Sequence, residues 1–269
     1  MRLTRIAKLS STLLLGALLA VAGAAPAQAG TAAAPVDYVA LGDSYSSGVG
    51  AGEYDGASGN CKRSNRAYPK LWAAANAPSS FAFTACSGAL TSDVTATQLG
   101  PLNSGTDLVS LTVGGNDAGF SDVMTTCVLQ SESACINRVN QAKAYVDSTL
   151  PGRLDSVYRA IRAKAPAARV VVLGYPRFYK LGGGCLLGLS ENERAAINGA
   201  ADHLNTAVAK RAADHGYTFG SVVPAFTGHE ICSPAPWLHS VNWTNIGDSY
   251  HPTAAGQSGG YLPVFRSNA

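Results

Sequence analysis

The sequence has little charge, and what charge it has is unevenly placed. Only 14% of its 269 residues are charged. The first 34 residues carry Arg2, Arg5 and Lys8, and the remainder holds 17 basic and 17 acidic residues. A chain with no net charge over this length lacks the basic surface that binds phosphate backbones, so we expect no nucleic-acid partner. Its 46% hydrophobic content also separates it from acidic disordered proteins.

The sequence also lacks the common signatures of metal and cofactor binding. It contains no C-x-x-C, and none of its five histidines lies in an H-E-x-x-H pattern. The segment Gly48-Val49-Gly50-Ala51-Gly52 resembles a dinucleotide-binding loop, but its last glycine comes too early for that motif. We therefore expect neither a metal nor a cofactor.

No apolar run in the chain is long enough to cross a bilayer. Three positive charges precede the apolar run 11–25, which is followed by Ala27-Gln28-Ala29. This run is shorter than the roughly 20 residues that a membrane helix needs, and the small residues after it are typical of a cleavage site. We expect residues 1–29 to be a secretory signal peptide, with cleavage at Ala29 or as far on as Ala34. Residues 30–269 then form one secreted domain, which we expect to be a monomer.

Six cysteines are present, an even number. In an exported chain they are better explained as three disulfides than as zinc ligands or nucleophiles. The sequence alone does not choose among the possible pairings. We expect the sequential one, because each bridge would close a loop beside the segments discussed below. Its pairs are Cys61 with Cys86, Cys127 with Cys135, and Cys185 with Cys232.

The hydrophobic pattern predicts strands that alternate with helices. The predicted strands are short and rich in β-branched or aromatic residues, at 37–41, 81–85, 108–113 and 170–173, with a weaker candidate at 217–223. The predicted helices are 68–76, 136–164 with an interruption at Pro151-Gly152, and 191–214, which opens with a Ser190-x-x-Glu193 capping box. This alternation indicates a single α/β domain with a mainly parallel sheet between helical layers.

Small polar residues follow the first three predicted strands. They are Gly42-Asp43-Ser44, Cys86-Ser87-Gly88 and Gly114-Gly115-Asn116-Asp117. Ligands of parallel sheets bind beyond the carboxyl ends of the strands, so these residues are the candidates for chemistry.

Ser44 and His251 form a candidate nucleophile and base. A serine at a strand-to-helix turn exposes its hydroxyl, but it needs a base to attack a carbonyl. His251 lies in Asp248-Ser249-Tyr250-His251-Pro252, where Asp248 is spaced to orient the imidazole. Taken singly, Ser44 is equally well explained as a helix N-cap, and His251 as a surface histidine.

The remaining requirement of ester hydrolysis is a set of donors for the oxyanion. The Ser44 N–H, the Gly88 N–H and the Asn116 side-chain amide come from three strand ends and are our candidates, with Asp117 orienting its loop.

A different pattern, Gly256-Gln257-Ser258-Gly259-Gly260, matches the G-x-S-x-G elbow of α/β-hydrolases. No strand precedes it, and no acid or histidine follows it, so we reject it.

Gly42-Asp43-Ser44, Gly88, Gly114-x-Asn116-Asp117 and Asp248-x-x-His251-Pro252 resemble the four signature blocks of the SGNH hydrolases, also called GDSL esterases and lipases. The blocks appear in order across nearly all of the chain after the signal peptide. The chain is most similar to the secreted streptomycete GDSL lipases and phospholipases, which share the six-cysteine layout. One departure is Tyr45, where many members have leucine, which we expect to alter only the pocket wall.

The resemblance implies a flavodoxin-like three-layer αβα sandwich and metal-independent hydrolysis of carboxylic esters. It makes Ser44 the nucleophile, His251 the base, and Ser44, Gly88 and Asn116 the oxyanion hole. Either the Asp248 carboxylate or a backbone carbonyl, that of Ser249, orients the imidazole. The partner we expect is an acyl lipid, bound by the apolar loops 178–189 and 234–243. The alternatives are a carbohydrate acetyl esterase and a non-catalytic secreted binding protein.

Overall fold

A parallel sheet forms the centre of the protein. The computed structural model describes residues 36–269, and the predicted signal peptide and its cleavage region lie outside the described residues. The sheet has five strands in the order β2 (Ser80–Phe83), β1 (Asp37–Ala40), β3 (Leu108–Leu111), β4 (Arg169–Leu173) and β5 (Thr218–Gly220). All four neighbouring pairs are parallel. The predicted α/β class and parallel sheet are therefore confirmed.

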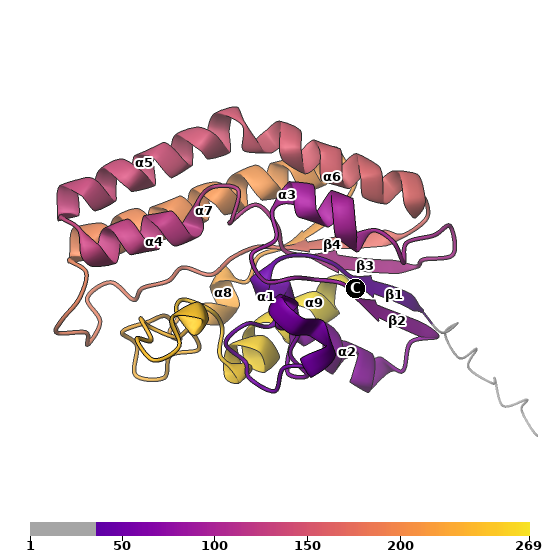
Figure 1. Cartoon of the computed structure of the whole chain (residues 1–269), viewed down its shortest axis with the longest axis horizontal. Helices are drawn as coiled ribbons and strands as arrows, with labels where there is room; N and C mark the ends of the chain where they lie inside the picture. The colour runs from indigo at the N-terminus through magenta and orange to yellow at the C-terminus, as the bar shows by residue number, and fades with distance from the viewer. Residues whose placement is uncertain (1–35) are drawn as a thin grey trace, which may run out of the picture. The chain divides into compact units, whose positions relative to one another are not determined.

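Helices cover both faces of the sheet, as Figure 1 shows. On one face lie α3 (Thr91–Asp93), α4 (Phe120–Leu129), α5 (Glu132–Ser148), α6 (Leu150–Lys164) and α7 (Glu191–Asp214). On the other lie α1 (Ser44–Ser47), α2 (Tyr68–Asn76), α8 (Val223–Phe226) and α9 (Leu262–Asn268). Short 3₁₀ segments span Gly56–Cys61 and Ile246–Asp248, and π-helical turns span Val94–Gln98 and Gly256–Tyr261.

The strand order determines where a ligand can bind. The chain passes from β1 outward to β2 and then returns to β3 on the opposite side of β1. In doubly wound sheets such a reversal leaves a crevice at the carboxyl ends of the two strands on either side of it. The segments after β1 and β3 are those that hold Ser44 and Asn116.

Local sequence explains the best-predicted elements. The residues 170–173 of β4 are all buried, as its run of valines and leucine predicts. Helix α7 has the predicted bounds because its capping box forms. The Ser190 hydroxyl accepts from the Glu193 amide at 3.2 Å, and the Glu193 carboxylate accepts from the Ser190 amide at 2.7 Å.

The helices between β3 and β4 differ from the prediction, and α5 begins at Glu132 rather than at residue 136. The long predicted helix is two helices, and the break falls at Thr149 rather than at Pro151-Gly152. Proline is tolerated in the first helical turn, where its missing N–H would have no partner, so Pro151 starts α6. Helix α4 was not predicted, because it begins after Gly119 (φ +76°) without a side-chain cap.

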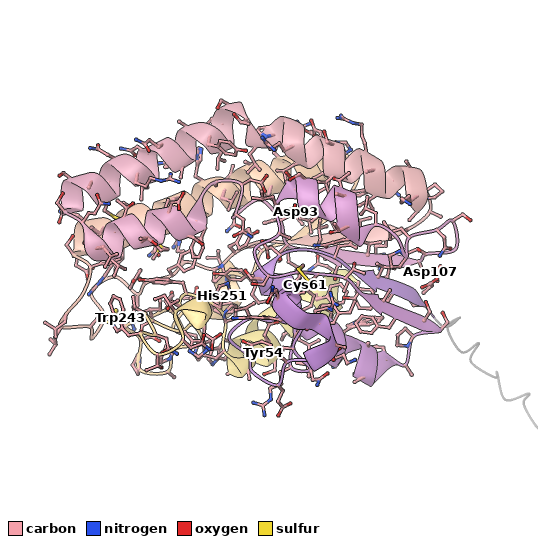
Figure 2. All side chains as sticks on the ribbon, in the orientation of Figure 1. Tyr54, Cys61, Asp93, Asp107, Trp243 and His251 are labelled. Atoms are coloured by element: carbon pink, nitrogen blue, oxygen red, sulfur yellow. A yellow bond between two sulfur atoms is a disulfide. The ribbon has the colours of Figure 1, made fainter. Side chains whose placement is uncertain are left out.

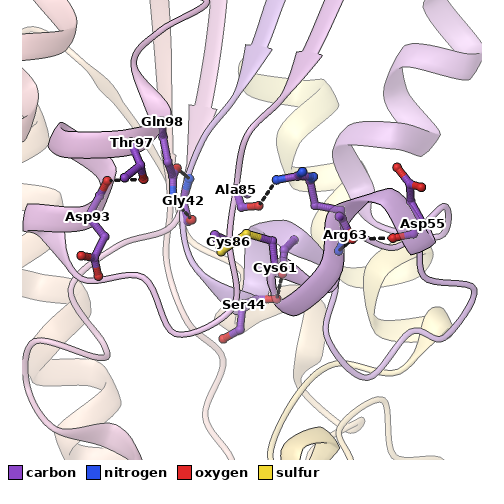
Figure 3. Close-up of a disulfide and its surroundings, with 12 residues drawn as sticks. Gly42, Ser44, Asp55, Cys61, Arg63, Ala85, Cys86, Asp93, Thr97 and Gln98 are labelled. Carbon is purple, nitrogen blue, oxygen red and sulfur yellow. Dashed lines mark hydrogen bonds between the residues drawn. A yellow bond between two sulfur atoms is a disulfide. The ribbon is translucent and has the colours of Figure 1, made fainter.

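The structure forms the sequential disulfides Cys61–Cys86, Cys127–Cys135 and Cys185–Cys232. The second bridge joins α4 to α5, and the third closes the loop before α7. Figure 3 shows the first bridge beside Ser44. It ties the 3₁₀ segment Gly56–Cys61 to the loop that follows β2.

Candidate active site

The turn after β1 holds Ser44 at the start of α1. Gly42 has a φ of +125°, and a Cβ there would lie 2.6 Å from the Thr112 carbonyl oxygen, so only glycine fits. Asp43 caps the helix, and its Oδ1 accepts from the Tyr45 amide at 3.0 Å. Ser44 itself is 6% exposed. The strand and its cap therefore hold this hydroxyl in one place.

Asp43 links the Ser44 turn by hydrogen bonds to residues that follow β3 and β4. Its carboxylate accepts from the Thr112 hydroxyl at 2.6 Å and from the Tyr175 hydroxyl. The Tyr175 oxygen in turn accepts from the Gly115 amide at 3.2 Å. Burial raises the pKa of Asp43 to about 6, although these donors oppose the shift. One buried carboxylate thus connects the Ser44 turn to the loop of Asn116.

His251 lies within hydrogen-bonding distance of Ser44. Its Nε2 is 2.8 Å from the Ser44 Oγ, and its Nδ1 is 3.0 Å from the Ser249 carbonyl oxygen. A carbonyl oxygen only accepts, so Nδ1 carries the proton and Nε2 is free to accept from the serine hydroxyl. Figure 2 shows His251 near the middle of the molecule, between the two helical layers.

The protonation state of His251 is set by its surroundings. Burial lowers its pKa from 6.5 to about 4, and the hydrogen bond to the Ser249 carbonyl and the charge of Asp248 only partly oppose this. The imidazole is therefore neutral at pH 7, the form that a general base requires.

Asp248 does not contact the imidazole, unlike the arrangement that its spacing suggested. Its Oδ1 accepts from the Tyr54 hydroxyl at 3.2 Å, and its Oδ2 accepts from the Asn245 side-chain Nδ2 at 2.7 Å. Tyr250, between Ser249 and His251, has a φ of +65°. This turn brings the Ser249 carbonyl to Nδ1 and leaves the Asp248 carboxylate directed toward Tyr54. The second expected arrangement, the carbonyl of Ser249, is the one in the structure.

Gly88 and Asn116 lie on two adjoining loops. The Asn116 Nδ2 donates to the Ala89 carbonyl at 3.0 Å, which ties the loop after β3 to the residue that follows Gly88. Gly88 has a φ of +77° and is exposed. The Cys86 amide donates to the Gly42 carbonyl at 2.9 Å, so this loop also adjoins the Ser44 turn. An amide nitrogen has two donors, and the second of Asn116 has no protein acceptor in the described part of the chain.

Asp117 orients the same loops from the other side. Its carboxylate accepts from the Thr91 amide at 3.0 Å and from the Thr91 hydroxyl at 2.6 Å. These contacts agree with the structural role predicted for it.

A narrow apolar pocket, here called the inner pocket, extends from Ser44 toward the helices. It begins at Ser44 and Asn116 and continues between α4, α5 and α7. Its apolar walls include Phe120, Val123, Met124, Val146, Ile197 and Leu204. Most of the lining is apolar, and Lys143 of α5 also lines it.

A second, more open depression, here called the outer groove, adjoins His251. It shares Phe120 and Met124 with the inner pocket, so α4 separates the two. Its other apolar residues are Val128, Leu129, Val241, Trp243, Ile246 and Tyr250. Of the two loops expected to bind an acyl chain, 234–243 contributes Val241 and Trp243 here, and 178–189 contributes Phe178 to the inner pocket.

Sequence reasoning missed three parts of the site. Tyr45 does more than line the pocket, since its hydroxyl donates to the Tyr250 carbonyl at 2.7 Å and its ring centre lies 5.3 Å from that of His251. Tyr175 and α4 had no local signal, because a lone tyrosine and an uncapped helix look ordinary in sequence. The rejected Gly256–Gly260 pattern lies in a π-helical turn, with Ser258 exposed.

The described residues contain no cluster of three or more side chains suited to hold a metal. The histidines outside the site have other partners: His203 with Asp147, His215 with Asp155, His229 with the Ala235 carbonyl and His239 with the Gly50 carbonyl. Among residues 36–269, no helix is both long and apolar enough to span a bilayer.

Comparisons with known proteins give one consistent result. Residues 40–258 match the GDSL-like Lipase/Acylhydrolase family. Lipase 1 of Streptomyces coelicolor is 67% identical over 269 residues, which is the full length of both chains. The crystal structure of phospholipase A1 from Streptomyces albidoflavus NA297 is 73% identical with a TM-score of 0.86, covering 88% of this chain and 100% of that one. The extracellular lipase structure from Streptomyces rimosus is 67% identical with a TM-score of 0.85, covering 87% and 100%.

Proposed function

The chain belongs to the GDSL-like Lipase/Acylhydrolase family and is a carboxylic ester hydrolase, and we propose that Ser44 and His251 are its catalytic pair. The observation that supports this most directly is the 2.8 Å contact between His251 Nε2 and Ser44 Oγ, together with the proton held on Nδ1 by the Ser249 carbonyl. Of the expected alternatives, a non-catalytic binding protein is excluded by the family.

The reaction proceeds by acyl transfer in two halves. Ser44 Oγ attacks the acyl carbon while its proton passes to His251 Nε2, and the same proton then goes to the departing alcohol oxygen as the ester bond breaks. Water attacks the acyl-enzyme next, again losing its proton to Nε2. Ser44 recovers a proton from His251 as the carboxylic acid leaves.

The oxyanion that forms in each half needs preorganised donors. We assign this role to the Ser44 N–H, the Gly88 N–H and the second Asn116 N–H. The fixed Ser44 turn, the bond from Asn116 to Ala89 and the bond from Cys86 to Gly42 support this assignment, because they hold the three loops together. Donors that are already in place stabilise developing charge without reorganisation.

Replacement of the nucleophile is the direct test. Ser44→Ala should lower turnover of p-nitrophenyl butyrate by at least about 10³-fold and abolish labelling by a fluorophosphonate probe. Ser258→Ala, in the rejected G-x-S-x-G pattern, is the matched control and should keep full activity and labelling. Labelling that persists in Ser44→Ala and disappears in Ser258→Ala would overturn the assignment.

The substrate we propose is an acyl lipid with medium or long chains, either a glyceride or a phosphoglyceride. The inner pocket and outer groove support this, since both offer extended apolar walls on either side of α4. The relatives whose names include lipase and phospholipase A1 point the same way. An acetyl group is too short to contact such walls, so a carbohydrate acetyl esterase would not need them.

A chain-length series measures the preference. The kcat/KM should rise from p-nitrophenyl acetate to octanoate, and the enzyme should release fatty acid from triglyceride or phosphatidylcholine. A steep fall from acetate to octanoate would favour the acetyl esterase instead.

We also propose that the enzyme is secreted after removal of residues 1–29, or of a few more up to Ala34, and acts as a monomer of one domain. The three disulfides support export, because such bonds persist in oxidising compartments. The N-terminal residue of protein recovered from culture medium, and its mass in solution, test these points.

A further inference from the structure

Five large apolar side chains of residues 36–269 are more than 60% exposed. Leu186 is 96% exposed, Leu187 89%, Trp243 71%, Leu129 66% and Ile246 64%. Single exposed apolar residues are ordinary, but a contiguous group usually marks a contact surface. We call these five side chains the apolar rim.

The rim residues come from three segments that adjoin one another. Leu129, Trp243 and Ile246 line the outer groove together. The segment after Leu187 is tied to the start of α5, because the Ser190 hydroxyl and the Asn192 side-chain Nδ2 both donate to the Glu132 carboxylate. Figure 1 shows the loop before α7 at the end of the molecule where α4 ends, and Figure 2 labels Trp243 at that end.

The rim side chains themselves carry no charge, and the charged residues next to them are mostly acidic. The rim segments are flanked in sequence by the acidic residues Asp122, Glu132, Glu191 and Asp248, and by the basic residue Lys180, and Lys62 approaches Gly247. A surface built to attract anionic lipid or an acidic protein would carry an excess of basic residues near its edge. Uncharged leucine, isoleucine and tryptophan instead match the boundary between the headgroups and acyl chains of a neutral or zwitterionic lipid layer.

We propose that the apolar rim docks onto the surface of neutral or zwitterionic lipid aggregates, and that the outer groove opens directly into the docked surface. The inference rests on the proposed lipid substrate. His251 lies in the same groove as Trp243 and Ile246, so an acyl chain drawn from the lipid reaches the catalytic pair along apolar side chains. The acyl chain then does not have to cross water, where its exposed CH₂ groups would be unfavourable.

The double variant Leu186→Ser/Leu187→Ser tests the rim without touching the site, since neither leucine lines the inner pocket or the outer groove. In the Ser44→Ala background, which cannot degrade the lipid, its partition onto phosphatidylcholine vesicles should fall about tenfold or more in a flotation assay. Leu186→Met/Leu187→Met is the matched control and should keep the partition, because it changes the same loop and retains apolar side chains. With Ser44 restored, both variants should hydrolyse dissolved p-nitrophenyl butyrate at the normal rate.

Trp243 provides a second readout. Its emission should shift to shorter wavelength when vesicles are added to the Ser44→Ala protein, and this shift should be absent in Trp243→Phe. Equal vesicle binding by the Ser and Met double variants would overturn the proposal. The proposal would also be overturned if the rim mediated self-association instead. In that case the protein would be a dimer that does not bind vesicles, and Leu186→Ser/Leu187→Ser would dissociate it.

The substrate proposal fails separately. A wild-type enzyme that cleaves acetyl esters but no glyceride or phosphatidylcholine would refute the lipid substrate, whatever the outcome of the vesicle experiments. An enzyme that cleaves dispersed lipid but shows no rim-dependent partition would refute only the docking surface.

Discussion

At the scale of single residues, the site depends on how His251 is held and on what surrounds it. The Ser249 carbonyl fixes the imidazole tautomer, and burial keeps the ring neutral. In an Asp-containing triad, a carboxylate would both orient the ring and stabilise the imidazolium that forms during the reaction. Here a neutral oxygen orients the ring, and the Asp248 charge acts only from a distance.

The pH dependence of activity should show this lowered pKa. Only the neutral imidazole accepts a proton, so activity is full above the pKa of His251 and is lost as the pH falls through it. With a pKa of about 4, kcat/KM should stay nearly constant from pH 7 to about pH 5 and fall tenfold per unit below about pH 4. Initial rates at each pH, with enzyme returned to pH 7 to check for unfolding, measure this. A midpoint near 6.5 would contradict the lowered pKa of His251.

Substitution of Asp248 separates the two ways of orienting the histidine. Asp248→Asn keeps an oxygen for Tyr54, and it removes no hydrogen bond from His251. We expect kcat to change by less than about threefold, whereas loss of a true triad carboxylate lowers it by about 10⁴-fold. A steady-state comparison with His251→Ala, which should be nearly inactive, sets the scale. A loss of 10³-fold or more in Asp248→Asn would assign the carboxylate a direct role.

At the scale of elements, α4, α5 and α7 form the inner pocket, while the strand ends supply the chemistry. Helix α4 lies between the inner pocket and the outer groove, and the Cys127–Cys135 bridge ties its end to α5. Under the proposed function, these helices limit the acyl chains that fit, together with the Ser44 turn at the mouth of the pocket.

A larger side chain on α7 should shorten the preferred chain. Ala200 is half-buried and lines the inner pocket, so Ala200→Leu should lower kcat/KM for p-nitrophenyl octanoate by about tenfold and leave the acetate nearly unchanged. Ala196→Leu is the matched control, because Ala196 is also half-buried on α7 but does not line the pocket. Equal losses on both esters would show that the pocket does not hold the acyl chain.

At the scale of the whole molecule, the chain after residue 34 has 17 basic and 17 acidic residues, and the exposed apolar side chains of Leu129, Trp243 and Ile246 lie together at the outer groove. No net field steers charged substrates toward the site. The proposed docking surface relies on apolar contact for this reason.

The equal numbers of basic and acidic residues predict that activity depends little on salt concentration. For dissolved p-nitrophenyl butyrate, a neutral ester, kcat/KM should change less than about twofold between about 20 and 500 mM NaCl, a range over which screening removes long-range electrostatic effects. Stopped assays at constant pH measure it. A tenfold fall with salt would indicate steering by a local charge cluster that the overall balance conceals.

The sequence by itself determined the sheet, the main helices and the order of the site segments. The valine run of β4, the capping box of α7 and the small residues after β1, β2 and β3 are local patterns, so they can be recognised without knowledge of the distant contacts. The resemblance added roles for Ser44, His251, Gly88 and Asn116, which the structure places on adjoining loops.

The tertiary structure decided what depends on residues far apart in the chain. The Ser249 carbonyl rather than Asp248 meets His251 because the turn at Tyr250 and the bond from Tyr54 set the direction of each group. The hydrogen bond from the Tyr175 hydroxyl to Asp43 joins residues 132 positions apart. Helix α4 has no side-chain cap, so its position depends on packing. Such contacts have no local signature, since the free energy that selects them comes from burial and pairing in the folded chain.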